Sequence, residues 1–167
     1  MNTSVNPGTP EQKEELKELK KNVSRSGLCT INVLTNDENY HDWRIQMIEN
    51  LTAHGLHPIV DNSFDPSLYK SDTQKEILQL LRNAFAPILR KCLKTTKGLE
   101  LINLDNIKPD EVWKSHHSFQ TSTSHARTMQ NEILQRLHST KISGRSGSRA
   151  TFVNYINLQI RKWESFG

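Results

Sequence analysis

The clearest pattern of apolar and polar positions runs from Asn39 to Leu56. Its large apolar residues recur at intervals of three and four, which places them along one face of a helix. These residues are Tyr40, Trp43, Met47, Ile48 and Leu51. We expect the two aromatic residues to anchor a hydrophobic core, because an aromatic stripe at helical spacing is usually buried. The solvent side of the same helix would carry Arg44, Gln46, Glu49 and Asn50.

Residues at both ends of this stretch favour a helix with these bounds. Asn36, Asp37 and Asn39 offer side-chain oxygens that can cap the N–H groups of a first turn. Gly55 is typical of the residue that follows a helix, because glycine adopts a positive φ without strain. The sequence therefore predicts one well-delimited amphipathic helix here.

Similar periodicity predicts further helical segments. They span residues 11–23, 71–98, 109–119, 124–139 and 150–163. Ser71 begins a capping box at the start of the second segment, Pro87 predicts a kink or a break within it, and Gly98 is expected to end it. Residues 28–34 are expected to be extended, whereas residues 99–107 are ambiguous. The pattern predicts an all-α chain.

Size and composition restrict the class of protein. The chain has 167 residues, of which 34% are hydrophobic and 24% charged, which suits one domain or one domain and a fragment of a second. It has no run of about 18 apolar residues and no apolar leader at its start, so we expect an intracellular protein without a membrane partner. Cys29 and Cys92 lie far apart, and we expect no disulfide between them in a reducing compartment.

Basic residues are concentrated in two blocks of this chain, whose formal net charge is +4. No acidic residue lies between Arg82 and Lys97, and Glu132 is the only one between Arg127 and Lys162. Such blocks attract phosphate backbones, although a solvated basic face without a defined partner has the same composition. The candidate nucleic-acid contacts are Arg90, Lys91, Lys94, Arg145 and Arg149.

Sequence motifs of catalysis and cofactor binding are missing. The chain contains no glycine-rich phosphate loop and no nucleophile elbow. Its seven histidines provide no pair on one helix face, so no metal site is predicted. Cys92 lies among basic residues, but no histidine and asparagine complete a nucleophilic set, and we expect a buried core residue. We therefore predict a protein that is not an enzyme, with no catalytic residue, cofactor or small-molecule substrate.

The stretch from Leu34 to Leu56 resembles the opening of the Gag polyprotein of copia-type long-terminal-repeat retrotransposons. The residues that fill the family pattern are Leu34, Asn39, Tyr40, Trp43, Met47, Leu51, Gly55 and Leu56. Trp113 and Phe119 match the aromatic positions of a second family segment, and residues 151–163 are similar to a third one around Tyr155. The three matches follow one another in the family's order.

This resemblance implies a compact multi-helix capsid-like N-terminal domain plus one extra C-terminal helix. The expected organisation is a mobile tail and polar helix over 1–26, the capsid-like domain over 27–140 and a flexible basic linker over 141–149. Residues 150–167 would be the first helix of a truncated second subdomain.

The function implied by the resemblance is structural. Copies of the chain would associate with one another, or with full-length Gag, into cytoplasmic virus-like particles that enclose RNA. The last helix has a broad apolar stripe and no following helix to cover it, so we expect it to mediate self-association. The residues concerned are Phe152, Ile156, Ile160 and Trp163. The alternatives are a nucleic-acid-binding helical module, or a truncated or domesticated Gag that interferes with assembly.

Overall fold

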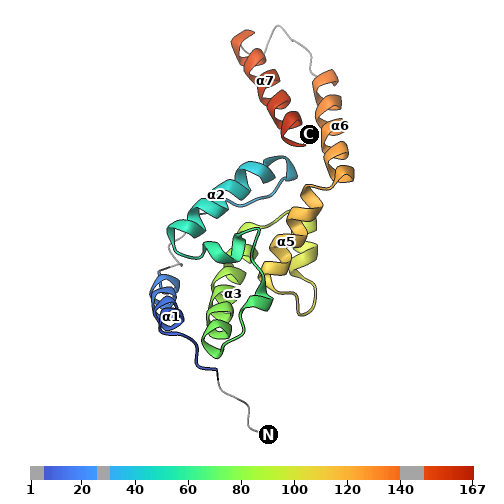
Figure 1. Ribbon diagram of the computed structural model, residues 1–167. Coiled ribbons are helices and arrows are strands. Elements are labelled where there is room, and N and C mark those ends of the chain that lie inside the picture. The colour runs from blue at the N-terminus through green and yellow to red at the C-terminus, as the bar shows by residue number, and fades with distance from the viewer. Residues whose placement is uncertain (1–5, 26–30, 140–148) are drawn as a thin grey trace. The chain divides into compact units, whose positions relative to one another are not determined.

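The computed structural model describes residues 6–25, 31–139 and 149–167. Within these ranges every regular element is a helix and no strand occurs, which confirms the predicted all-α fold (Figure 1). The α-helices are α1 (Pro10–Val23), α2 (Tyr40–Ala53), α3 (Asp72–Cys92), α4 (Thr96–Ile102), α5 (Pro109–Gln120), α6 (Thr123–Ser139) and α7 (Arg149–Ser165). The short 3-10 helices are η2 (Asp37–Asn39), η3 (His57–Val60) and η4 (Pro66–Leu68).

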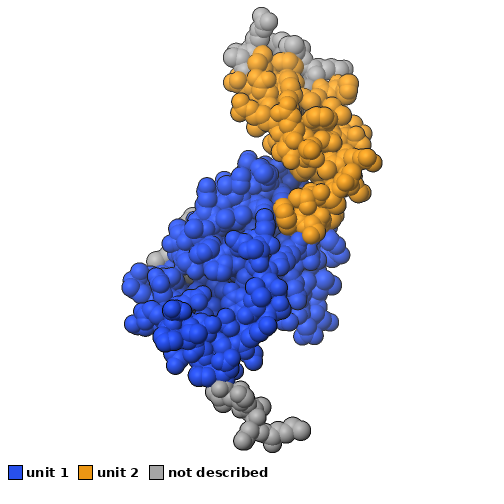
Figure 2. Space-filling view, in the orientation of Figure 1, with its two compact units in different colours: residues 1–115 blue, residues 116–167 orange. Residues whose placement is uncertain are grey.

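The chain divides into two compact units, residues 1–115 and residues 116–167, which Figure 2 shows in different colours. The first unit contains α1 to α4 and the start of α5, and the second contains the end of α5 with α6 and α7. The boundaries predicted for the domains, 27–140 and 150–167, differ from those of the two compact units, and this domain organisation stays a prediction. The predicted linker over 141–149 lies outside the described residues, apart from the first position of α7.

The core of the first unit forms where α2, α3 and α5 bring aromatic rings together. The centroid of the Trp113 ring lies 5.9 Å from that of Trp43 and 5.8 Å from that of Phe85. Both indole N–H groups are satisfied, since Trp43 donates to the carbonyl of Asn32 and Trp113 to the carbonyl of Val60. The predicted role of Trp43 as a core anchor is confirmed. Each such ring pair adds about 0.5–1.5 kcal/mol beyond the area that it buries.

The apolar face predicted for α2 packs into this core. Tyr40, Trp43, Met47 and Leu51 are buried and Ile48 is half-buried. The N-terminal cap differs in detail, because the side chain of Asn36 accepts the N–H of Glu38 at 2.9 Å and so caps η2. Asn39 makes no side-chain cap bond. Gly55 has a φ of +70°, as expected for the residue that ends the helix.

Arg44 does not lie on the solvent side of α2, contrary to the sequence pattern. The residue is only 8% exposed. Its Nη2 donates to the side-chain oxygen of Asn62 at 2.9 Å, and its Nη1 donates to the hydroxyl of Tyr40 at 3.4 Å. The guanidinium carbon lies 4.5 Å from the centroid of the Trp113 ring. The prediction was wrong because the loop after η3 and helix α5 cover this side of α2.

The start of α3 agrees with the sequence. Ser71 accepts the N–H of Gln74 at 3.1 Å, and the side chain of Gln74 accepts the N–H of Ser71 at 3.0 Å, which completes the predicted capping box. Pro87 lies inside the helix, and α3 continues through it as one helix without a break.

Helix α3 ends earlier than predicted, since the sequence pattern placed its end at Gly98. The helix ends at Cys92, because the chain there leaves the helix to pair with Leu34. The N–H of Leu34 donates to the carbonyl of Cys92 at 2.7 Å, and the N–H of Lys94 donates to the carbonyl of Leu34 at 2.8 Å. Gly98 lies inside α4. The pairing agrees with the extended conformation predicted for residues 28–34 at one position, Leu34, and residues 28–30 lie outside the described residues.

Helix α1 packs against α3 (Figure 1). Leu19 is buried, and Lys20 Nζ lies 2.7 Å from the carboxylate of Glu76. The segment before α1, predicted as a mobile tail, also contacts α3, since the Thr73 hydroxyl donates to the carbonyl of Pro7 at 2.7 Å. These contacts hold α1 against α3 within the first unit.

Helices α6 and α7 form an antiparallel pair in the second unit (Figure 1). Met129 and Ile133 of α6 are buried. The side-chain amide of Gln130 donates to the carbonyl of Trp163 at 3.3 Å, which ties the middle of α6 to the end of α7. The ring of His125, at the start of α6, packs against aromatic rings that flank the pair.

Candidate association and nucleic-acid surfaces

Two side chains of types that often serve in catalysis, Cys92 and His116, are buried. Cys92 is buried with its Sγ 3.8 Å from the carbonyl oxygen of Ile31, which confirms the predicted core role. His116 is buried, and its ring lies 3.4 Å from the side-chain amide of Gln120. No group of three or more His, Cys, Asp and Glu side chains in these parts is arranged to hold a metal ion. No helix among them has the length and apolar character needed to cross a membrane.

Three of the five predicted nucleic-acid contacts lie together at one end of the first unit. Arg90 and Lys91 occupy the last turn of α3, and Lys94 follows two residues after its end. All three are exposed, and none lies within 4.0 Å of a carboxylate belonging to a described residue. We call them the basic cluster. Arg145 lies outside the described residues, and for Arg149 the description is limited to the backbone at the start of α7.

Helix α6 covers part of the apolar stripe predicted for self-association. Phe152, Ile156 and Trp163 are half-buried, whereas Ile160 is 41% exposed. The cover comes from the preceding helix α6, and the role of this set in self-association stays a prediction. Part of the predicted set belongs to the core of the helical pair.

Two exposed apolar residues of α7, Val153 and Leu158, lie outside the set predicted for self-association. Val153 is 46% exposed and lies seven residues before Ile160, so both fall on the same face of the helix, with Ile156 between them. We call Val153, Ile156 and Ile160 the apolar edge. The sequence carries no signal that separates this edge from the stripe facing α6, because the burial of the polar residue Gln159 is decided by the fold.

Two buried polar atoms in α7 lack hydrogen-bond partners among the described residues. They are Oε1 of Gln159 and Nε1 of Trp163. Most buried polar atoms in folded proteins are paired, and an unpaired one costs about 1–3 kcal/mol. These unpaired atoms make the packing of α6 against α7 less favourable than that of the first unit's core, where both indole N–H groups have partners.

A groove that the sequence analysis did not anticipate lies beside α1 in the first unit. It consists of two hollows of about 240 and 270 Å³, which share His57 and Pro58 as lining residues. The first hollow has an apolar floor made by Leu19, Ile77 and Leu81. We call the two hollows together the acidic groove, because carboxylates from α1 and from the loops around η4 line both parts.

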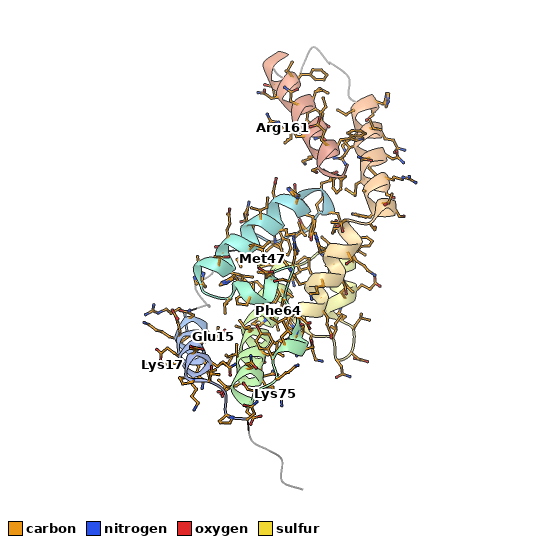
Figure 3. All side chains as sticks on the ribbon, viewed as in Figure 1. Glu15, Lys17, Met47, Phe64, Lys75 and Arg161 are labelled. Carbon is orange, nitrogen blue, oxygen red and sulfur yellow. The ribbon has the colours of Figure 1, made fainter. Side chains whose placement is uncertain are left out.

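Four acidic side chains line the acidic groove: Glu15, Glu18, Asp61 and Asp65. The hydroxyl and the N–H of Ser63 donate to Asp61 and hold the pKa of that carboxyl below its usual value. The N–H of Ser67 lowers the pKa of Asp65 in the same way. Burial raises the pKa of Tyr69, and the charge of Glu15 raises it further, so Glu15 acts on both hollows. Figure 3 labels Glu15 and, in the second hollow, Phe64.

Comparison with known proteins does not assign the chain to a family. No family model, no curated protein and no solved structure matches it. The resemblance to copia-type Gag therefore stays a prediction from the motifs named above.

Proposed function

We propose that this chain is a structural, non-catalytic protein of the Gag capsid type, whose copies associate into cytoplasmic particles that enclose RNA. The observation that carries the proposal is that the motif residues behind the resemblance lie together in one core. Trp43 and Trp113 come from two separate motifs, and their rings meet in one core at 5.9 Å. Met47, Leu51 and Leu56 of the first motif are fully buried around them. Residues of separate motifs that pack in one core depend on each other for close packing. Their meeting in this core supports the view that the motifs describe one helical fold shared with the Gag family.

The surface of α7 supports association of copies. Val153 and Ile160 leave apolar area in solvent. A second copy that covered this area would remove it from water, at about 25 cal/mol for each Å².

The proposal is tested by light scattering and negative-stain microscopy of the purified chain, with and without RNA. We expect a mass above that of the monomer, and particles when RNA is added. Val153→Glu combined with Ile160→Glu should reduce the mass towards the monomer. Ile45→Glu, at a residue of α2 that is 44% exposed, is the matched control and should leave association unchanged. A wild-type chain that stays monomeric at high concentration, with and without RNA, contradicts the proposal.

Nucleic-acid binding is a second candidate function, favoured by the basic cluster. Phosphate contacts by Arg90, Lys91 and Lys94 would release counterions, which makes the affinity fall with salt. Replacing all three by Gln should lower the slope of log affinity against log salt by about 2. The control with the same loss of charge changes Lys13, Lys70 and Lys108, which are also exposed, to Gln. A salt slope unaffected by the first variant would rule out these contacts.

A further inference from the structure

Two surfaces of opposite charge lie on the first unit, and the charges named below on each have no ion-pair partner among the described residues. The acidic groove beside α1 is one, and the basic cluster at the end of α3 is the other. Each combines charge with apolar area, which is the composition of a surface that a partner covers. Neither surface forms part of the hydrophobic core or of the apolar edge of α7.

The first hollow of the acidic groove carries the least compensated negative charge. Glu15 and Glu18 are exposed, and neither forms an ion pair within 4.0 Å with any residue that the structure describes. Two of the four lysines of α1 are engaged elsewhere, since Lys17 pairs with Glu14 and Lys20 with Glu76. The other two, Lys13 and Lys21, are exposed and have no carboxylate of a described residue within 4.0 Å.

The second hollow differs from the first in the charges around it. Hydrogen bonds from Ser67 lower the pKa of Asp65 most, and the charge of Lys114 lowers it further, whereas His57 lines both hollows. The excess of negative charge is therefore greatest at Glu15 and Glu18, over the apolar floor of the first hollow.

The basic cluster also has an apolar neighbour. Leu34 pairs with the chain at Leu93 and Lys94, and its side chain is buried. Side chains alternate along an extended segment, so Val33 points the other way, and it is 48% exposed. The surface at this end therefore presents a valine beside three cations.

The two surfaces of one copy cannot meet each other. Arg90 follows Leu81 by nine residues, which is about two and a half turns and about 14 Å along α3. Arg90 therefore lies on the opposite side of α3 from Leu81, which forms part of the groove floor. A contact between the two kinds of surface must join different copies. A contact between two different patches is head-to-tail and can be repeated from copy to copy.

We propose that the acidic groove of one copy receives the basic cluster and Val33 of a second copy. This inference rests on the proposed function, because it names surfaces through which copies associate. Glu15 and Glu18 would face Arg90, Lys91 and Lys94, while the valine covers the apolar floor. Opposite charges would set the direction of the contact and speed its formation, and added salt would weaken it.

A charge exchange tests the contact in the full chain. One variant combines Glu15→Lys with Glu18→Lys, and the other combines Arg90→Glu, Lys91→Glu and Lys94→Glu. Each alone places like charges against each other in every possible contact, and we expect its association to weaken by about tenfold or more in sedimentation velocity at low salt. An equimolar mixture restores opposite charges at each contact, so association should return.

Controls separate this contact from the other proposals. Glu49→Lys combined with Glu132→Lys makes the same change of net charge as the groove variant, at exposed positions away from the groove, and should associate like the wild type. Circular dichroism checks that each variant is folded. A mixture that stays dissociated, or a groove variant that associates normally, overturns the head-to-tail contact and leaves association through α7 intact. A wild-type chain that never associates overturns both.

Discussion

Arg44 brings a positive charge into the core and is held there by neutral groups. Its hydrogen bonds go to Tyr40 and Asn62, and its guanidinium lies over the face of Trp113. A cation over an indole ring contributes about 0.5–2 kcal/mol, with the larger values at desolvated sites. Arg44 thereby links α2 to α5 and to the loop after η3.

The pH dependence of stability should reveal the burial of Tyr40. Burial raises the pKa of Tyr40 from 10.0 to about 12, and the neighbouring Arg44 opposes this rise. The folded chain therefore keeps the phenol proton at a pH where the unfolded chain releases it. The resulting stabilisation, roughly 2 kcal/mol, is complete below about pH 10 and is lost as the pH rises towards about 12.

Thermal melts between pH 8 and pH 12 measure this effect. Tyr40→Phe removes the phenol, so the wild type should lose more stability than the variant over the alkaline range. Parallel loss of stability in both proteins would contradict the burial of the hydroxyl.

The ion pair between Arg82 and Asp110 should matter more than any exposed pair. Two parallel bonds of 2.8 and 3.0 Å join the guanidinium to the carboxylate, and the Asp110 side chain is only 3% exposed. Asp110→Ala should lower the free energy of unfolding by about 3 kcal/mol, because it leaves Arg82 unpaired in a partly buried site. Urea denaturation measures the change.

The pair of Lys97 and Glu100, at 2.9 Å, has side chains that are 31% and 60% exposed and provides the more solvated control. Glu100→Ala should cost less than about 1 kcal/mol, because water screens the pair. Equal effects of the two substitutions would show that burial does not govern these ion pairs.

Among the elements, α1 and α3 share one cap. The Ser71 hydroxyl accepts the N–H of Gln74 and donates to the side chain of Gln12, which itself belongs to the capping box of α1. A single serine therefore caps α3 and attaches α1 to it. This arrangement explains how a helix with few buried residues stays in place.

Ser71→Ala should lower the free energy of unfolding by about 1–2 kcal/mol, since it removes the cap and the bond to Gln12. Hydrogen exchange should also quicken in α1. Ser139→Ala, at the exposed end of α6, is the control and should stay within about 0.5 kcal/mol of the wild type. An unchanged exchange rate in α1 would mean that Ser71 does not attach it.

Differences in packing between the two units give a prediction for the whole molecule. α3 buries Ile77, Leu81, Phe85 and Leu89, whereas α7 contains unpaired buried polar atoms. Backbone amides of α6 and α7 should therefore exchange with solvent faster than those of α3 in dilute protein. Raising the protein concentration should increase protection in α7, because association covers the apolar edge.

Hydrogen exchange followed by mass spectrometry at two concentrations checks this prediction. Exchange in α7 that is as slow as in α3 at the lower concentration would contradict it. Protection of α7 that does not depend on concentration would argue against association through this helix.

The sequence by itself determined the features that depend on near neighbours. Helical spacing located α2, the Ser71 capping box located the start of α3, and Gly55 marked the end of α2. It also identified Trp43 as a core residue and α7 as a helix with an apolar stripe. These predictions succeeded because periodicity and caps express contacts within a few residues along the chain.

Only the tertiary structure decided where each helix face goes. Leu34 ends α3 at Cys92, and residues distant in sequence bury Arg44. Packing of α1 on α3 creates the first hollow of the acidic groove, and packing of α6 on α7 divides the apolar stripe into a covered part and an exposed edge. Contacts between distant segments have no local period in the sequence, so a single chain does not reveal them before it is folded.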